Sequence, residues 1–190
     1  MIEIPIEISA RHAHLTELTL KKLFGPEVEL KTHKKLSQAD EFASAHVVTL
    51  RCGDRKIENV RVLGPCRDHD QIEVAFTDAR ALKAKVPLRL SGNSSGSAPV
   101  TLVGTVGSVD LAEGMIIAKR HLHIGLEEAE KLGLKDGQVV SLEVAGDRAG
   151  RLDQCLVRIK PGFRMSFHLD TDEGNALGLT GREKGKLIIS

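Results

Sequence analysis

The residues with the clearest chemical meaning are two histidine pairs. His12 and His14 form the first pair, His121 and His123 the second, with one residue between the histidines of each. On a β-strand, side chains two positions apart point to the same face, so both imidazoles of a pair can reach one ion. Imidazole nitrogen is a good zinc ligand. The alternative is a pair of exposed histidines at a strand end, without any ligand.

The two pairs belong to an internal repeat. Ile8–Leu15 (ISARHAHL) matches Ile117–Ile124 (IAKRHLHI), and in both copies a short predicted strand precedes the histidines and a short predicted helix follows. A repeated supersecondary unit usually means a duplicated architecture, and two similar β domains fit a chain of 190 residues. The shared context favours two metal half-sites, each of which needs a further ligand.

Two residues are candidates for the missing ligands, because three histidines, or two histidines and a carboxylate, leave a zinc position open for substrate. His168 lies in the alternating run Met165–Asp170, and Glu73 lies in the strand-like run Gln71–Val74. The alternatives are a histidine with ordinary partners at a barrel end and a solvated strand glutamate. We interpret the remaining histidines as surface residues: His33, His46 and His69.

Several other polar residues lie beside these motifs. Arg67 follows a Gly-Pro turn, and its planar guanidinium suits a phosphate or carboxylate partner, although an ordinary surface arginine is the commoner case. Arg11 and Arg120 each precede a histidine pair, and either can support it by pairing with an acid. Cys66 has no base beside it in the sequence, so we interpret it as a structural thiol.

The elements that must position these residues are mostly short strands separated by Gly, Pro and Asp. Such spacing predicts a sandwich or a barrel. Short helices are predicted over Thr16–Phe24, with Thr16 as N-cap, around Leu126–Leu132, and from Thr171 onward. Ser91–Pro99 reads as a flexible surface loop. The predicted strands are Ile2–Ile8, His46–Arg51, Lys56–Leu63, Gln71–Phe76, Val86–Leu90, Val100–Val103, Ser108–Leu111, Met115–Ala118, Val139–Val144, Gln154–Ile159, Met165–Leu169 and Lys186–Ile189.

The composition excludes some classes of function. A net charge of +1 and 3% aromatic residues argue against a nucleic-acid partner. No apolar run has the length of a membrane span, and the first residues lack the apolar region of a signal peptide. The three cysteines show no disulfide framework. We therefore expect a soluble, cytoplasmic protein in a reducing environment.

Several dispersed motifs together resemble the PduL-type phosphate acyltransferases (phosphate propanoyltransferases), over nearly the whole chain. In sequence order they include Ser9–Leu15, Leu36–Gln38, Glu58–Pro65, Arg67, Gln71–Glu73, Ser91–Gly92, Ala118–His123 and His168–Ala176.

The resemblance implies a mainly β fold of two small closed β-barrels with short helices, pseudo-duplicated and with the first strand exchanged between the barrels. Residues 1–10 and 119–190 would form one barrel and 11–118 the other, with the active site at their interface. It implies two Zn²⁺ per chain, one held by His12, His14 and Glu73, the other by His121, His123 and His168.

The implied reaction is acyl-CoA + phosphate ⇌ acyl phosphate + CoA. Arg67 would be the catalytic, phosphate-binding arginine. Coenzyme A contacts would fall on Ser9, Lys34, Arg61, Leu63 and Asn175. The resemblance leaves a homo-oligomer and a bacterial microcompartment shell open as partners, with propanediol degradation as the setting. The chain starts at its first predicted strand, so the targeting helix that packaged members often carry is not seen.

Two other functions compete with this interpretation. A cupin-like mononuclear oxygenase or isomerase would use His121, His123 and Glu127, but Glu127 falls in a helical pattern and the glycine spacing expected upstream is missing. A non-catalytic zinc-binding module of a microcompartment would bind metal without releasing thiol from acyl-CoA.

Overall fold

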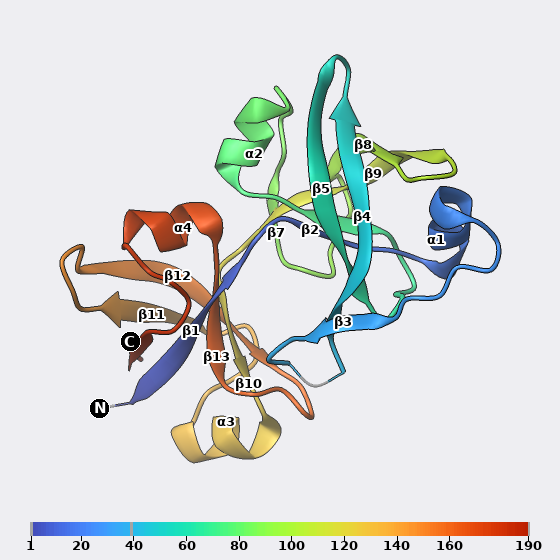
Figure 1. The fold of residues 1–190 in the computed structure, drawn as a ribbon. Coiled ribbons are helices and arrows are strands. Elements are labelled where there is room, and N and C mark those ends of the chain that lie inside the picture. Colours follow the sequence, from blue (N-terminus) through green and yellow to red (C-terminus); the bar gives the residue numbers. More distant parts are fainter. Residues whose placement is uncertain (1, 39, 190) are drawn as a thin grey trace. The chain divides into compact units, whose positions relative to one another are not determined.

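The computed structural model describes residues 2–38 and 40–189 and separates into two compact units. Unit 1 consists of residues 1–10 and 119–190, and unit 2 of residues 11–118. Both units are built mainly from strands, and the described residues of each unit include two short helices (Figure 1).

Unit 1 is a closed barrel with the strand order β1-β13-β10-β12-β11-β14. Helix α3 (Leu126–Leu132) follows β10, and α4 (Thr171–Ala176) follows β13. The strands are β1 (Glu3–Ser9), β10 (His121–Ile124), β11 (Val139–Val144), β12 (Gly150–Ile159), β13 (Ser166–Asp170) and β14 (Lys184–Ile188).

Unit 2 also closes through six strands, in the cyclic order β4-β5-β2-β6-β9-β8. Two further strands extend it, because β3 (Thr32–Lys35) pairs with β4 and β7 (Leu88–Arg89) pairs with β9. Helix α1 (Glu17–Phe24) follows β2, and α2 (Phe76–Ala81) follows β6. The six barrel strands are β2 (His12–His14), β4 (Phe42–Cys52), β5 (Arg55–Gly64), β6 (Gln71–Glu73), β8 (Ala98–Val103) and β9 (Ser108–Ala118).

The two barrels share one pairing pattern. In unit 2, β2 runs parallel to β5 and antiparallel to β6, and β6 runs parallel to β9. In unit 1, β10 has the same relation to β12 and β13, and β13 to β1. Strand β1 precedes β2 in the chain but belongs to unit 1, whereas β9 precedes β10 but belongs to unit 2. The predicted mainly β, pseudo-duplicated fold with an exchanged first strand is thus confirmed.

Each barrel encloses its own apolar core, which keeps the short strands together by removing their inward side chains from water. In unit 1, Phe167, Ile4 and Leu142 are fully buried. In unit 2, Leu50 and Ile72 occupy the same kind of position.

Local signals explain the helix boundaries. The Thr16 hydroxyl accepts a hydrogen bond from the Thr19 amide (3.2 Å), as expected of an N-cap, and Gly25 ends α1 with a φ of 105°. Asp170 caps α4 by accepting from the amide of Glu173 (2.8 Å).

Some of the predicted elements were wrong. The two strands expected over Ser108–Leu111 and Met115–Ala118 form the single strand β9. The strand expected over Gln71–Phe76 ends at Glu73, and the sequence did not indicate α2 or β3. Helix α2 has only six residues and no apolar repeat, so its sequence does not predict a helix. The helix is seen only in the folded structure.

The Ser91–Pro99 segment, predicted to be a flexible surface loop, is held by hydrogen bonds to neighbouring strands, and its last two residues, Ala98 and Pro99, belong to strand β8. The Gly92 amide donates to Gln71 Oε1 (2.7 Å), and the Gly114 amide donates to Ser97 Oγ (2.6 Å). The loop is therefore anchored to β6 and β9.

Within residues 2–38 and 40–189, none of the helices combines the length and apolar character needed to cross a lipid bilayer.

One close contact in unit 2 can be tested by mutation. A Cβ on Gly104 would overlap the backbone oxygen of Leu23 and lie 2.7 Å from Leu23 Cβ, so α1 would have to move. We expect Gly104→Ala to lower the free energy of unfolding by about 1–3 kcal/mol, the usual range for overpacking. Urea denaturation would measure it, with Gly53→Asn as control, because Gly53 has open space and a φ of 57° that Asn tolerates. Equal stability of the wild type and Gly104→Ala would contradict the packing argument.

Candidate metal centres

Unit 2 brings one histidine pair and a carboxylate together. The three-residue strand β2 lies between β5 and β6, and His12 stands opposite Glu73 in the antiparallel register. The ligand atoms of His12, His14 and Glu73 all lie within 4.8 Å of one another, and all three residues are buried. Strand alternation therefore places the two imidazoles on one face, as the sequence indicated.

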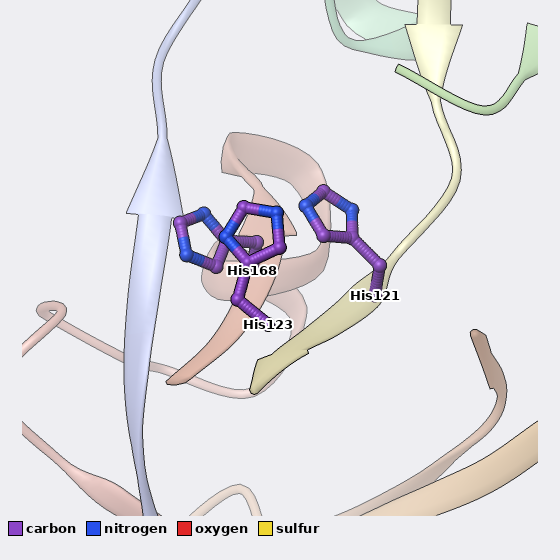
Figure 2. Close-up of side chains that lie close together, drawn as sticks. All are labelled: His121, His123 and His168. Carbon is purple, nitrogen blue, oxygen red and sulfur yellow. The ribbon is translucent and has the colours of Figure 1, made fainter. Parts of the chain in front are cut away.

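Unit 1 repeats the arrangement with three histidines (Figure 2). His121 faces His168 across the β10–β13 pair, and the ligand atoms of His121, His123 and His168 lie within 4.8 Å of one another. The His168 ring centroid is 5.1 Å from that of His121 and 4.3 Å from that of His123. His168 thus occupies the position that Glu73 has in unit 2.

Burial keeps one histidine of each pair uncharged. Desolvation, reinforced by neighbouring His12, lowers the pKa of His14 far below its ordinary value, and burial together with His168 does the same to the pKa of His123. Neutral imidazole is the form that binds metals. His14 Nδ1 and both ring nitrogens of His123 are buried without a hydrogen-bond partner. A buried polar atom normally has one, so these atoms fit metal ligands.

The backbone selects the nitrogen that His121 can offer to a metal. His121 Nδ1 lies 2.8 Å from the carbonyl oxygen of Lys119. A carbonyl only accepts, so Nδ1 carries the hydrogen and Nε2 has the lone pair for a metal. With three-ligand sets of His/His/Glu and His/His/His, both clusters fit zinc sites that keep one position open.

Each histidine pair is preceded by an arginine that pairs with an acid, as the sequence suggested. Arg11 Nη1 lies 2.6 Å from Asp78 Oδ1 on α2, and Arg120 Nε lies 2.6 Å from Glu173 Oε1 on α4. Both acids occupy the third position of the helix that follows the third ligand. Burial raises the pKa of Glu173 even though Arg120 opposes the shift. The pairs join the start of each histidine strand to the helix beyond the third ligand.

Arg67 lies close enough to His14 for its charge to lower the pKa of that histidine. Its backbone amide donates to the Leu15 carbonyl (2.9 Å), which holds the turn against the end of the β2 segment. Its Nη2 lies 2.9 Å from Glu41 Oε1, so the guanidinium already has an anionic partner.

The residues expected to contact coenzyme A divide between the units. In unit 2, Lys34 pairs with Ala43, which in turn pairs with Leu63, and Arg61 stands in register with His12. The Arg61 guanidinium donates to the carbonyls of Ser44 and Ala45 (3.1 Å each). In unit 1, Ser9 pairs with Asp170, the N-cap of α4, and exposed Asn175 lies on that helix.

The three histidines outside the clusters, all interpreted as surface residues, differ in how exposed they are and in what they contact. His33 is exposed, as predicted, and His46 packs on Phe24 with ring centroids 4.7 Å apart. His69 is not a simple surface residue, because its Nε2 is buried without a hydrogen-bond partner and its Nδ1 lies 2.6 Å from Asp68 Oδ1.

Sequence reasoning missed three polar residues beside the clusters. Gln71 donates to Glu73 Oε1 (2.7 Å), and Ser166 Oγ lies 2.9 Å from His168 Nε2. Glu7 Oε2 lies 3.7 Å from His168 Nε2, in register with it on β1. Alternation could have found Gln71 and Ser166, each two positions before a proposed ligand, but the partner of Glu7 is set by strand pairing.

The lowered pKa values predict acid instability of the metal-free protein. Below about pH 6.5 the unfolded chain protonates histidines that the fold keeps neutral, so the unfolding free energy falls as pH falls, by up to about 1.4 kcal/mol per pH unit for each such histidine. Urea denaturation between pH 5 and 8 in chelator would measure this slope. His123→Asn should flatten it and His33→Asn, at an exposed position, should not. A wild-type slope of zero would contradict the burial argument.

The sequence of the chain is similar to those of known proteins. A profile of the phosphate propanoyltransferase family matches residues 5–180. Similar relatives are phosphate propanoyltransferases from Lachnoclostridium phytofermentans (45% identity, 93% of this chain, 83% of the relative), Alkaliphilus metalliredigens (40%, 98% and 88%) and Shewanella putrefaciens (41%, 94% and 84%). With such identity over nearly its whole length, the chain belongs to the phosphate propanoyltransferase family of phosphate acyltransferase enzymes.

Proposed function

We propose that the chain transfers a short acyl group between coenzyme A and inorganic phosphate, and that it does so with two bound Zn²⁺. The observation that carries the metal part is the duplicated three-ligand cluster, with buried, unpartnered nitrogens on His14 and His123. Family membership supports the acyl transfer.

His12, His14 and Glu73 would hold one ion, and His121, His123 and His168 the other. When bound, a zinc ion with three protein ligands supplies a Lewis acid with an open position, at which a thioester carbonyl is polarised or an anion is held. We further propose, from the sequence resemblance, that both clusters serve one active centre. An electron paramagnetic resonance spectrum of the protein with two Mn²⁺ that shows only uncoupled ions would contradict this last proposal.

Arg67 orients phosphate in the proposed reaction. Its guanidinium can donate two parallel hydrogen bonds to phosphate oxygens and offset their charge. Glu41 holds the guanidinium in this structure, so phosphate would have to compete with that carboxylate.

We propose direct attack by phosphate rather than an acyl-enzyme. A phosphate oxygen forms a bond to the thioester carbonyl carbon and hydrogen phosphate gives up its proton to solvent. The C–S bond breaks, and coenzyme A leaves as a thiolate that takes a proton from solvent. Burial raises the pKa of Cys155 to about 12 and also raises the pKa of Cys66, so neither thiol is prepared to act as a nucleophile. Holding both reactants in line could supply up to about 7–11 kcal/mol of barrier reduction.

Coenzyme A binding is proposed for Ser9 and Asn175 in unit 1 and for Lys34, Arg61 and Leu63 in unit 2. The relation of Arg61 to His12 supports the assignment, because neighbouring strands carry both. The proposed setting is the cytoplasm or a bacterial microcompartment, as the sequence resemblance suggests.

A cupin-like site would need Glu127 among the ligands. Glu127 is exposed in the first turn of α3, whereas a ring nitrogen of His168 lies within 4.8 Å of those of His121 and His123, which supports His168 as the third ligand. The family match likewise favours acyl transfer over a non-catalytic zinc module.

A free-thiol assay tests the proposal. With propanoyl-CoA, we expect thiol release that requires phosphate, stops after chelator treatment and returns with Zn²⁺, with acetyl- and butanoyl-CoA reporting the chain preference. His12→Ala and His121→Ala should each abolish turnover and lose one equivalent of metal, whereas exposed His33→Ala should keep both. Normal turnover in both ligand variants would refute the two-metal centre.

Substitution of Arg67 should affect phosphate selectively. We expect Arg67→Ala to raise the KM for phosphate roughly tenfold or more, because charge-assisted hydrogen bonds are lost, and to leave the KM for acyl-CoA unchanged. Glu41→Gln should lower the KM for phosphate by releasing the guanidinium, and exposed Arg55→Ala serves as control. Steady-state kinetics at varied phosphate would decide, and an unchanged KM in Arg67→Ala would exclude the assigned role.

A further inference from the structure

The third ligand of each cluster has a hydrogen-bond partner on its own strand. On β6, Gln71 Nε2 donates to Glu73 Oε1 at 2.7 Å, and on β13, Ser166 Oγ lies 2.9 Å from His168 Nε2. Each partner precedes its ligand by two residues, so both side chains point to one face of the strand. The two barrels thus share the hydrogen-bond partner of the third candidate ligand as well as the candidate ligands themselves.

The register of the strands makes these two partners equivalent. Gln71 stands opposite His14 in the β2–β6 pair, and Ser166 stands opposite His123 in the β10–β13 pair. Each lies beside the histidine whose ring nitrogen is buried without a hydrogen-bond partner. The chemistry of each partner suits its ligand, because an amide N–H donates to a carboxylate and a hydroxyl can hydrogen-bond an imidazole nitrogen.

The amide orientation of Gln71 is fixed by its surroundings. Gln71 is completely buried, and its Oε1 accepts from the Gly92 amide at 2.7 Å. A backbone N–H can only donate, so the carbonyl oxygen must face Gly92 and the NH₂ group must face Glu73. The same NH₂ group donates to Ser91 Oγ at 3.1 Å. The anchored loop therefore holds Gln71, and Gln71 holds Glu73.

The two oxygens of Glu73 consequently have separate partners. Oε1 accepts from Gln71, whereas Oε2 lies 3.7 Å from His12 Nε2. Two nitrogen or oxygen ligands of one tetrahedral zinc are about 3.4 Å apart, since each bond is about 2.0–2.1 Å long. The spacing of Oε2 and Nε2 is close to that separation, so Glu73 is prepared to bind through one oxygen.

We infer that Gln71 and Ser166 are positioning residues, each of which fixes the third metal ligand of its barrel, with Glu73 held to a single ligating oxygen. The inference rests on the metal sites of the proposed function and not on acyl transfer. Neither residue would contact the reactants. Each would act through its ligand, and each on its own barrel alone.

Single-site proteins give the clearest test, with Co²⁺ as the probe. In a His123→Ala background only the His12/His14/Glu73 cluster is complete, and in a His14→Ala background only the three-histidine cluster is complete. We expect Gln71→Met, which keeps the side-chain length but removes the amide, to weaken Co²⁺ binding 10–100-fold in the first background, as loss of a partner to a ligand does elsewhere. Ser166→Ala should do the same in the second background.

Each substitution is the matched control for the other. Ser166→Ala in the His123→Ala background and Gln71→Met in the His14→Ala background should leave Co²⁺ affinity unchanged. The visible absorption of bound Co²⁺ should change only where affinity falls, which a general loss of stability would not produce. If Gln71→Met does not fold, Gln71→Asn, with the amide withdrawn by one methylene, should weaken the same site.

Unchanged Co²⁺ affinity and spectrum in both matched backgrounds would overturn the inference. Equal weakening in matched and unmatched backgrounds would also overturn it, because the effect would then be global. Failure of the unsubstituted protein to bind metal would instead refute the metal sites themselves. Metal binding without phosphate-dependent thiol release would refute acyl transfer and leave this inference standing.

Discussion

Buried imidazoles must find partners inside the protein, because a ring nitrogen removed from water without a hydrogen bond costs free energy. His12, His14, His121 and His123 are each at most 8% exposed. The strands bring their rings together rather than apart, and burial lowers the pKa of one histidine in each pair. Each cluster therefore contains one histidine that burial keeps neutral, with the ligand atoms of two further residues within 4.8 Å, an arrangement that fits a divalent cation.

The barrels hold the short histidine strands β2 and β10 in register with their neighbours. β2 has three residues and β10 four, too few to be stable alone, yet each lies between one parallel and one antiparallel neighbour. The antiparallel neighbour brings the third ligand directly opposite the first histidine. An arginine then ties the start of each histidine strand to the helix beyond the third ligand, through Asp78 in one barrel and Glu173 in the other.

Duplication did not keep the two clusters identical. Glu73 gives the unit 2 cluster a carboxylate, whereas His168 stands at the corresponding position in unit 1, where Glu7 approaches the ring of His168 from β1. In unit 2 the corresponding neighbour of Glu73 is Ile116 on β9, which is apolar. Unit 2 therefore has no carboxylate at the position that Glu7 occupies in unit 1. The two candidate clusters thus differ in where the carboxylate stands, because Glu73 is itself a candidate ligand whereas Glu7 lies beside a candidate ligand.

Much of the site was visible in the sequence, because strand alternation and the internal repeat are local properties. They predicted that each histidine pair shares one face and made Glu73 and His168 candidate third ligands, and the family resemblance supplied the barrel topology. Strand alternation does not predict contacts between residues far apart in the chain, and these were seen only in the tertiary structure. The tertiary structure paired Glu41 with Arg67, tied the Ser91–Pro99 segment to Gln71, and brought Glu7 beside His168. Those contacts join residues far apart in the chain, so they depend on which strands become neighbours and in what register, and no short stretch of sequence specifies either.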